Sequence, residues 1–245
     1  MKVICIIQAR MGSERLPGKV LMDIAGKPML EHVITRLRQA QRIDEIIVAT
    51  SLKPADDSIT RFCEEKGVAV YRGSELDVLD RYYQAASLYQ PDIVIRVTAD
   101  CPLVDFEGID VLINELQENA LDYVAYDSLR IPRGLTGEVF TFDLLKRTYQ
   151  NADQPYEREH VTIYMYEHPE DFIIRSAEPP HWLKRPEFRL TVDTPEDLKL
   201  IRNIYESESL KNNTILDIKE VICLLDQKPE LSRLNRNICQ KDPRK

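Results

Sequence analysis

Short apolar runs rich in β-branched residues alternate with longer amphipathic segments along the first two-thirds of the chain. Four of these runs have the length and composition of buried strands, at residues 3–8, 45–50, 68–71 and 92–97. The first connecting segment repeats its apolar residues at steps of three and four, which gives a helix one buried face. These residues are Met29, Leu30, Val33, Ile34 and Leu37, and Pro28 stands at a favourable first helical position.

Two further helices are predicted between the strands, at residues 56–66 and 77–88. Parallel strands need long crossover connections, and such crossovers are right-handed. The alternation of strand and helix therefore predicts an α/β fold with three layers and a mostly parallel sheet.

The pattern becomes less regular after residue 121. We expect strands at 122–126, 137–142, 172–177 and 188–192, and helices at 142–150, 156–166, 195–205 and 211–226. Thr194 is the expected cap of the helix at 195–205. Charged and amide residues increase from residue 228, which predicts one domain over 1–227 and a frayed, flexible tail over 228–245.

Composition narrows the class of protein. Of the 245 residues, 43% are hydrophobic and 30% charged, as in globular proteins. No apolar run reaches the length of about 18 residues needed to cross a bilayer, and the run at 3–7 is too short for a signal peptide. Five scattered cysteines without a C-x-x-C pair indicate neither a disulfide framework nor a zinc site, so we expect a cytoplasmic protein. A net charge of -8 argues against nucleic-acid binding, and an anionic ligand must meet a local basic site.

The segment QARMGSERLPGK at residues 8–19 carries such a site. Arg10, Arg15 and Lys19 follow the first strand at its carboxyl end, where open α/β sheets bind ligands. Gly12 and Gly18 allow backbone amides to approach oxygens closely. The spacing matches neither G-x-x-x-x-G-K-[ST] nor G-x-G-x-x-G, which excludes a P-loop and disfavours a dinucleotide site. The segment therefore predicts a triphosphate cradle, with a solvated charged loop as the alternative.

Five blocks of sequence, in the same order, resemble the cytidylyltransferases that activate 3-deoxy-manno-octulosonate and acylneuraminates, and in particular their spore-coat polysaccharide branch. The blocks lie at residues 7–21, 72–83, 96–105, 158–162 and 189–197. The resemblance extends from the amino terminus to about Tyr205. It implies a nucleotide-diphospho-sugar transferase fold, which is Rossmann-like, and a magnesium-dependent transfer of CMP from CTP.

Two aspartates are the candidate Mg²⁺ ligands. Asp100 follows the strand at 92–97, Asp193 follows the strand at 188–192, and magnesium prefers one or two carboxylates with phosphate oxygens and water. The resemblance also gives both residues a metal-binding role. The alternatives are a turn residue at Asp100 and a helix cap at Asp193. Ala99 departs from the family, which has glycine there, and Asp105 and Asp197 are weaker candidates.

The resemblance places the nucleotide against the first loop and the block at 72–83. The expected contacts are Gln8, Ala9, Arg10, Met11, Gly12, Arg15, Lys19, Ser74, Asp77, Ala99 and Asp100. Asp80 and Arg81 can instead form a pair on the helix surface. The expected catalytic residues are Arg10, Arg15, Lys19, Asp100 and Asp193.

The irregular section at 129–171 is expected to line the far side of the cleft and to contribute to a homodimer. Its acceptor-binding candidates are Arg133, Glu138, Arg158 and His160. The expected reaction transfers CMP to a sugar acid or another small acidic acceptor. Three alternatives stay open: a UTP- or GTP-dependent sugar transferase, a non-catalytic nucleotide-binding relative, and a glycosyltransferase. The absence of a G-x-G-[ST]-R-[LM] loop disfavours the first, and the absence of a D-x-D pair near Asp100 disfavours the last.

Overall fold

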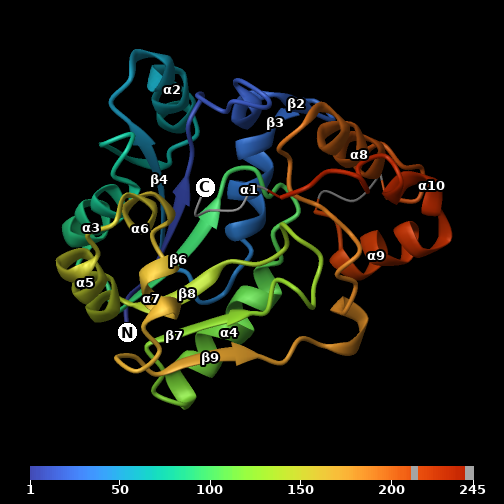
Figure 1. The fold of residues 1–245 in the computed structure, drawn as a ribbon. Helices are drawn as coiled ribbons and strands as arrows, with labels where there is room; N and C mark the ends of the chain where they lie inside the picture. The colour runs from blue at the N-terminus through green and yellow to red at the C-terminus, as the bar shows by residue number, and fades with distance from the viewer. Residues whose placement is uncertain (211–214, 241–245) are drawn as a thin grey trace.

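A seven-stranded sheet lies at the centre of the protein (Figure 1). The computed structural model describes residues 1–210 and 215–240. In the order β5-β4-β1-β6-β8-β7-β9, the strands are Ala69–Gly73, Glu45–Ser51, Val3–Gln8, Ile93–Thr98, Glu138–Thr141, Tyr123–Tyr126 and Ile174–Ala177. The first four are parallel, whereas β8 is antiparallel to both β6 and β7, and β7 pairs in parallel with β9. The predicted α/β fold with a mostly parallel sheet is confirmed.

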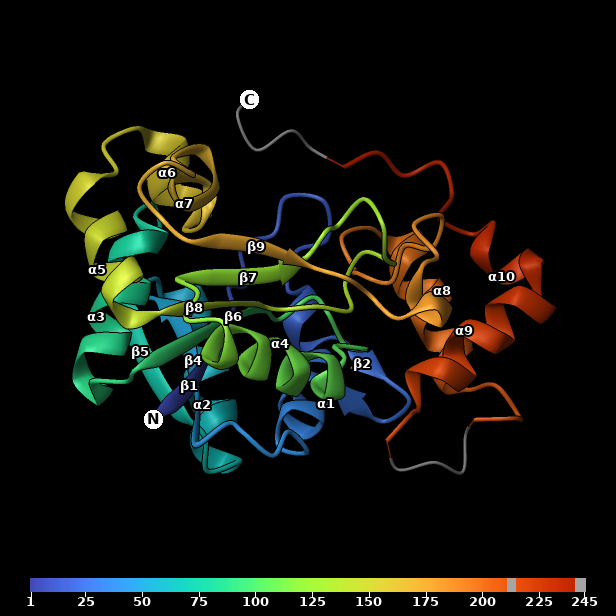
Figure 2. The same ribbon diagram turned by 90° about the horizontal axis from the view of Figure 1, so that it is seen from below.

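Helices cover both faces of this sheet (Figure 2). One layer contains α1 (Met29–Leu37), α2 (Asp57–Glu65) and α4 (Phe106–Glu118), and the other contains α3 (Val78–Tyr89), α5 (Phe142–Asn151), α6 (Pro155–His160) and α7 (Ile163–Glu167). Alternate residues of β1 point to opposite faces of the sheet. Cys5 and Ile7 belong to the hydrophobic core on one face, and Ile4 and Ile6 to the core on the other. The prediction of three layers is therefore also confirmed.

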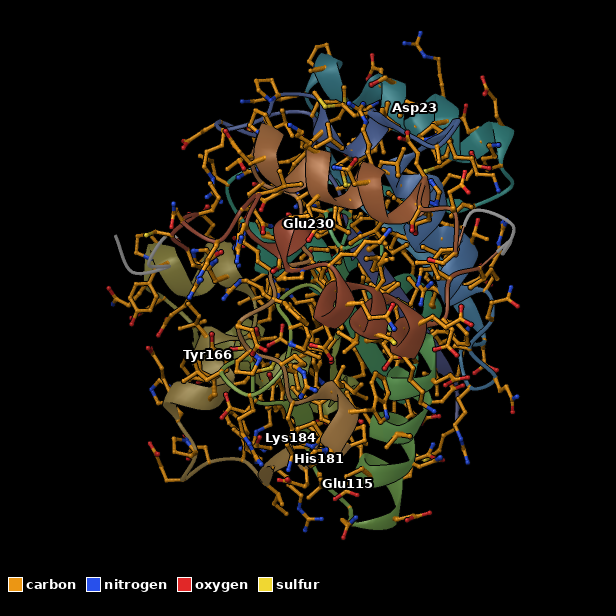
Figure 3. The ribbon with its side chains drawn as sticks, turned by 90° about the vertical axis from the view of Figure 1, so that its right-hand side faces the viewer. Asp23, Glu115, Tyr166, His181, Lys184 and Glu230 are labelled. Carbon is orange, nitrogen blue, oxygen red and sulfur yellow. The ribbon has the colours of Figure 1, made fainter. Side chains whose placement is uncertain are left out.

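The carboxyl-terminal helices pack at one side of the sheet (Figure 3). They are α8 (Pro195–Tyr205), α9 (Ile218–Gln227) and α10 (Pro229–Ser232). A short hairpin of β2 (Asp23–Ile24) and β3 (Lys27–Pro28) lies beside α8, where the Arg202 guanidinium donates to the carbonyl oxygen of Asp23 at 2.8 and 2.9 Å. None of the helices within 1–210 and 215–240 is both long and apolar enough to cross a membrane.

Four secondary-structure predictions need correction. Residues 188–192 form an extended segment with one isolated bridge between Arg133 and Arg189, because this segment pairs with loops rather than with the sheet. The helix expected at 156–166 is broken at Val161, whose φ of 54° lies in the left-handed region. Helix α4 has no counterpart among the expected elements. The last predicted helix begins at Ile218, and its expected start at 211–214 lies outside the described residues.

Residues 228–240 of the predicted tail include a short helix and one buried side chain. Pro229–Ser232 forms α10, and Asn235 is 3% exposed. In Figure 2, the chain after α10 runs along the outer edge of the molecule. The flexibility expected for residues 228–240 stays a prediction, and residues 241–245 lie outside the described part.

The chain order creates a switch point between β1 and β6. From β1 the chain proceeds to β4 and β5 on one side and then crosses to β6 on the other side of β1. Open α/β sheets usually bind ligands at the carboxyl ends of the strands at such a switch point. The amide of Ala99 donates to the carbonyl oxygen of Gln8 at 3.0 Å, so the loops after β1 and β6 start side by side.

Candidate active site

The loop after β1 is held by its own backbone and by a buried carboxylate. Gly18, with a left-handed φ of 73°, donates its amide to the carbonyl oxygen of Met11 at 2.9 Å and closes the loop. The short helix Lys19–Leu21 follows. The Met11 amide donates to Asp56 Oδ1 at 2.7 Å. These hydrogen bonds fix the backbone of the glycine-containing loop at the carboxyl end of β1.

Asp56 is a loop-supporting residue that the sequence did not identify. It is 3% exposed, and its second oxygen accepts from the amide of Ser51 at 3.2 Å and from the Ser51 hydroxyl. A carboxylate at the start of a predicted helix indicates a cap, so no local signal distinguished this role. Asp56 connects the end of β4 to the loop after β1.

Lys19 lies between the two predicted metal ligands. Its Nζ atom is 2.7 Å from Asp100 Oδ2, 2.8 Å from Asp193 Oδ1 and 2.8 Å from the carbonyl oxygen of Val192. Two carboxylates from distant parts of the sequence therefore converge on one cation position. The side chains of Lys19, Asp100 and Asp193 are 10%, 21% and 15% exposed, so water screens these charges only in part.

The cap alternative for Asp193 does not describe the structure, whereas Asp100 does lie in the turn after β6. Thr194 caps α8, because its hydroxyl accepts from the Asp197 amide at 3.3 Å, so Asp193 is not the cap. Asp100 Oδ1 accepts from the Thr98 hydroxyl at 2.5 Å, and its other oxygen faces Lys19. Both carboxylates thus direct an oxygen to the same point.

The pKa values in this group follow from burial and from charge pairing. Burial lowers the pKa of Lys19, but Asp100 and Asp193 outweigh it, and the net pKa is raised. Burial raises the pKa of Asp193, but Lys19, Arg15 and Arg189 outweigh it, and the net pKa is lowered. Burial raises the pKa of the neighbouring Cys101 to about 12, so this thiol stays protonated at neutral pH.

Two arginines bind the other oxygen of Asp193. Its Oδ2 atom is 2.9 Å from Arg15 and 2.6 Å from Arg189. The Arg189 guanidinium also binds Asp197, at 3.0 Å through Nε. Arg189 lies in the sequence block at 189–197. A spacing of four residues brings side chains together on a helix, but residues 189–193 are extended, so no local signal predicts this contact.

The donor set suits magnesium. Asp100 Oδ2 and Asp193 Oδ1 reach one cation within 2.8 Å, and they do so at the mouth of a loop rich in cations and backbone amides. Magnesium is usually bound by one or two carboxylates together with substrate phosphates and water. A divalent ion at this point would share its two oxygens with the ammonium of Lys19 or take its place.

The expected base-binding residues lie beside the loop but have structural partners. A Cβ atom on Gly12 would be 3.5 Å from Glu75, which places the segment after β5 against the loop. Ser74 Oγ accepts from the Asp77 amide, and Asp77 Oδ1 accepts from the Asp80 amide at 2.8 Å to cap α3. Arg81 is fully buried and donates to the Ser74 carbonyl oxygen at 2.9 Å, so it is not a surface pair with Asp80.

Two of the acceptor candidates are engaged in ion pairs. Glu138 pairs with Arg96 and accepts from the Tyr123 hydroxyl at 2.7 Å. Arg158 binds Asp77 at 2.6 Å. Arg158 was expected to contact the acceptor and Asp77 the nucleotide, so the ion pair joins the two expected binding regions. His160 is half-buried at the end of α6.

Two predicted cations remain available at the site. Within residues 1–210 and 215–240, neither Arg10 nor Arg133 forms an ion pair. Arg10 is half-buried directly after β1, and Arg133 is exposed beside Arg189, within electrostatic reach of Asp193 and Asp100. The charges of these two side chains can therefore serve anionic ligands.

Comparison with known proteins adds an independent observation. A family described as cytidylyltransferase matches residues 4–222. The spore coat polysaccharide biosynthesis protein SpsF of Bacillus subtilis is 37% identical, with 93% of this chain and 95% of that protein covered. A solved cytidylyltransferase from Leptospira borgpetersenii superposes with a TM-score of 0.88 at 31% identity, covering 99% of this chain and 100% of the other. A CMP:2-keto-3-deoxy-manno-octonic acid synthetase complexed with CTP shares the fold, with a TM-score of 0.65 at 22% identity and coverage of 85% and 100%.

Proposed function

This chain belongs to the cytidylyltransferase family, and we propose on that premise that it transfers CMP from CTP to a small acidic acceptor, a sugar acid above all, and releases pyrophosphate. The observation that supports this proposal most strongly is the convergence of Asp100 and Asp193 on one cation position beside the loop after β1. Two partly buried carboxylates aimed at a single point can hold a divalent ion beside the triphosphate, and such an ion supports nucleotidyl transfer.

The loop residues would bind the triphosphate. Arginine guanidinium groups bind phosphate oxygens in a fork, and Arg10 and Arg15 flank the glycine-containing turn. Lys19 would add a third positive charge at the inner end of the loop. These groups would stabilise the negative charge that develops on the departing pyrophosphate, which is the main demand of phosphoryl and nucleotidyl transfer.

Asp100 and Asp193 would hold Mg²⁺. When bound, the ion supplies charge neutralisation at the α-phosphate and polarises the attacking oxygen. The residues around the two carboxylates would keep them oriented: Thr98 binds Asp100, and Arg15 and Arg189 bind Asp193. The hydroxyl oxygen of the acceptor would form a bond to the α-phosphorus, and the bond to the pyrophosphate oxygen would break in line with it.

We propose Arg133 as the contact for the carboxylate of the acceptor. It is exposed, carries no ion pair within the described residues, and lies on the Asp193 side of the site. Glu138 and Arg158 would act through the partners that they already hold, Arg96 and Asp77. His160 stays a candidate base for the acceptor hydroxyl, because an imidazole nitrogen can accept its proton. The proposed homodimer through residues 129–171 likewise remains a prediction.

A pyrophosphate-release assay tests this function. Each of the four ribonucleoside triphosphates is combined with Mg²⁺ and with a panel of ulosonic acids, other sugar acids, aminosugars and phosphorylated small metabolites. We expect release with CTP and an acidic acceptor, at least about tenfold faster than with any other triphosphate.

Two outcomes would contradict the proposal. Faster release with UTP or GTP would identify a sugar nucleotidyltransferase of another nucleotide specificity. The second outcome is that calorimetry detects CTP binding while no acceptor leads to pyrophosphate release. That result would favour a non-catalytic nucleotide-binding protein. Omitting Mg²⁺ is the matched control, since release should then fall to the background.

A further inference from the structure

The chain segment after α10 contacts the residues that orient Asp193. Asn235 is 3% exposed although it lies only ten residues before the end of the chain. Its Nδ2 atom donates to the carbonyl oxygen of Arg189 at 2.9 Å and to Asp197 Oδ1 at 2.8 Å. One side-chain amide therefore binds both ends of the segment that carries Asp193.

Asp197 is the centre of this network and is completely buried. Its Oδ2 atom accepts from the backbone amides of Asp193 at 2.9 Å and Thr194 at 3.0 Å. Its Oδ1 atom accepts from Arg189 Nε at 3.0 Å and from Asn235. A buried carboxylate needs such a complete set of donors, and each donor in turn has its position fixed.

Arg189 connects this network to the site. Its guanidinium binds Asp197 through Nε and Asp193 Oδ2 through the terminal nitrogen, at 2.6 Å. The remaining nitrogen donates to Gln240 Oε1 at 3.0 Å, so the segment after α10 touches Arg189 a second time. The direction in which Asp193 presents its other oxygen depends on where this guanidinium lies.

The loop at residues 133–134 lies so close to residues 190–191 that this part of the backbone has little room to move. A Cβ atom on Gly134, whose φ is 97°, would lie 2.5 Å from the Thr191 amide nitrogen. The segment between Arg189 and Asp193 is thus pressed against the loop at Arg133 on one side. Asn235 and Asp197 hold the same segment by hydrogen bonds to its backbone.

We propose that Asn235 is a positioning residue of the active site, which sets the orientation of Asp193 through Arg189 and Asp197 and so controls the affinity for the divalent ion. This inference rests on the proposed function for its link to turnover. The segment from α10 to Gln240 would then contribute to the function of the site.

Three variants of Asn235 in the full-length chain separate hydrogen bonding from packing. Asn235→Ala removes the donor. Asn235→Asp keeps the shape but places a negative oxygen against Asp197 and the Arg189 carbonyl oxygen. Asn235→Ser keeps a small donor and should retain part of the function. Asn237→Ala is the matched control, because Asn237 is exposed on the same segment.

Three measurements follow for each variant. The Mg²⁺ concentration that gives half-maximal turnover should rise by about tenfold in Asn235→Ala and more in Asn235→Asp, while KM for CTP changes by less than about twofold. Electron paramagnetic resonance should show a matching loss of Mn²⁺ affinity in the absence of acceptor. Hydrogen exchange should accelerate at the amides of Asp193 and Thr194, with Asn235→Ser intermediate and Asn237→Ala unchanged.

The outcomes distinguish this proposal from the proposed function. Wild-type metal dependence and Mn²⁺ affinity in Asn235→Ala would overturn the positioning role, as would equal losses of CTP and metal affinity. If Asn235→Asp does not fold, the serine and alanine variants carry the same comparison. A wild-type protein that releases no pyrophosphate from CTP would refute the proposed function, and the Mn²⁺ and exchange measurements would then decide the positioning role alone.

Discussion

Asp100→Asn should lower pyrophosphate release from CTP by about a thousandfold at saturating substrates. The substitution removes one of two carboxylates aimed at the cation position, and the new amide nitrogen would face Lys19 in place of Oδ2. Charge stabilisation by a bound divalent ion is worth several kcal/mol, and about 4 kcal/mol corresponds to about a thousandfold in rate. The measurement is steady-state turnover with Mg²⁺, CTP and the acceptor identified by the pyrophosphate assay.

Asp226→Asn is the control for this variant. Asp226 is an exposed carboxylate that pairs with Arg185 at 3.3 Å on the surface, and its loss should leave turnover unchanged. CTP affinity should fall much less than the rate, because the loop after β1 is intact in Asp100→Asn. Turnover within tenfold of the wild type would remove Asp100 from the catalytic machinery.

Lys19→Met should reduce both turnover and stability. Loss of a charge-assisted contact to the triphosphate is expected to lower kcat/KM for CTP by about 100-fold. The two carboxylates around Nζ would also be left without their shared cation, at a cost of about 3 kcal/mol in the free energy of unfolding. Urea unfolding and steady-state kinetics measure the two effects separately.

The stability loss in Lys19→Met should depend on pH. The pKa of Lys19 is raised above its ordinary 10.5, so its contribution is present below that pH and lost as the pH rises through the folded-state pKa. The pKa of Asp193 is lowered below its ordinary 3.8, so its contribution is present above that pH and lost as the pH falls through the folded-state pKa. The difference between wild type and variant should therefore be largest between about pH 5 and pH 10 and shrink in acid.

Magnesium gives this prediction a further test. A divalent ion can replace the ammonium between the same two oxygens, so Mg²⁺ should raise the Tm of Lys19→Met more than that of the wild type. Lys199→Met, at an exposed position of α8, is the matched control and should change neither stability nor the response to Mg²⁺. An equal response to Mg²⁺ in Lys19→Met and wild type would argue against a shared cation position.

The sequence was most informative where a local pattern determines structure. The alternation of apolar runs located β1, β4, β5 and β6 to within one or two residues, because buried strands and amphipathic helices have distinct periods. The position of Asp100 directly after β6 predicted that its carboxylate lies at the carboxyl edge of the sheet. The expected strand before Asp193 is not part of the sheet, yet Asp193 still lies close to Asp100, because both carboxylates contact Lys19.

Contacts between distant segments were beyond the reach of the sequence. Lys19 was expected to face only phosphates, whereas its ammonium also holds two acids together. Asp77 and Arg158 were assigned to different substrates, yet they bind each other. Each of these residues has several possible partners in sequence, and the packing of α3 against α6 selects one of them.

The carboxyl-terminal segment shows the same limit. A stretch rich in charged and amide residues is typical of a frayed end, and composition contains no sign that one amide has buried partners. Asn235 is buried at a place where its amide donates to both Asp197 and the Arg189 carbonyl oxygen. Such a role depends on the arrangement of three separate segments, which only the folded chain brings together.

The central claim is that Asp100 and Asp193 together hold the divalent ion that acts on a triphosphate bound by the loop after β1. A crystal structure of the protein with CTP and Mn²⁺, recorded with anomalous scattering at the manganese edge, tests it most directly. We predict one manganese peak that touches a carboxylate oxygen of each aspartate and a phosphate oxygen of CTP, with the β- and γ-phosphates against Arg10, Arg15 and Lys19. A manganese ion that touches neither aspartate, or a triphosphate bound away from residues 8–19, would contradict the account.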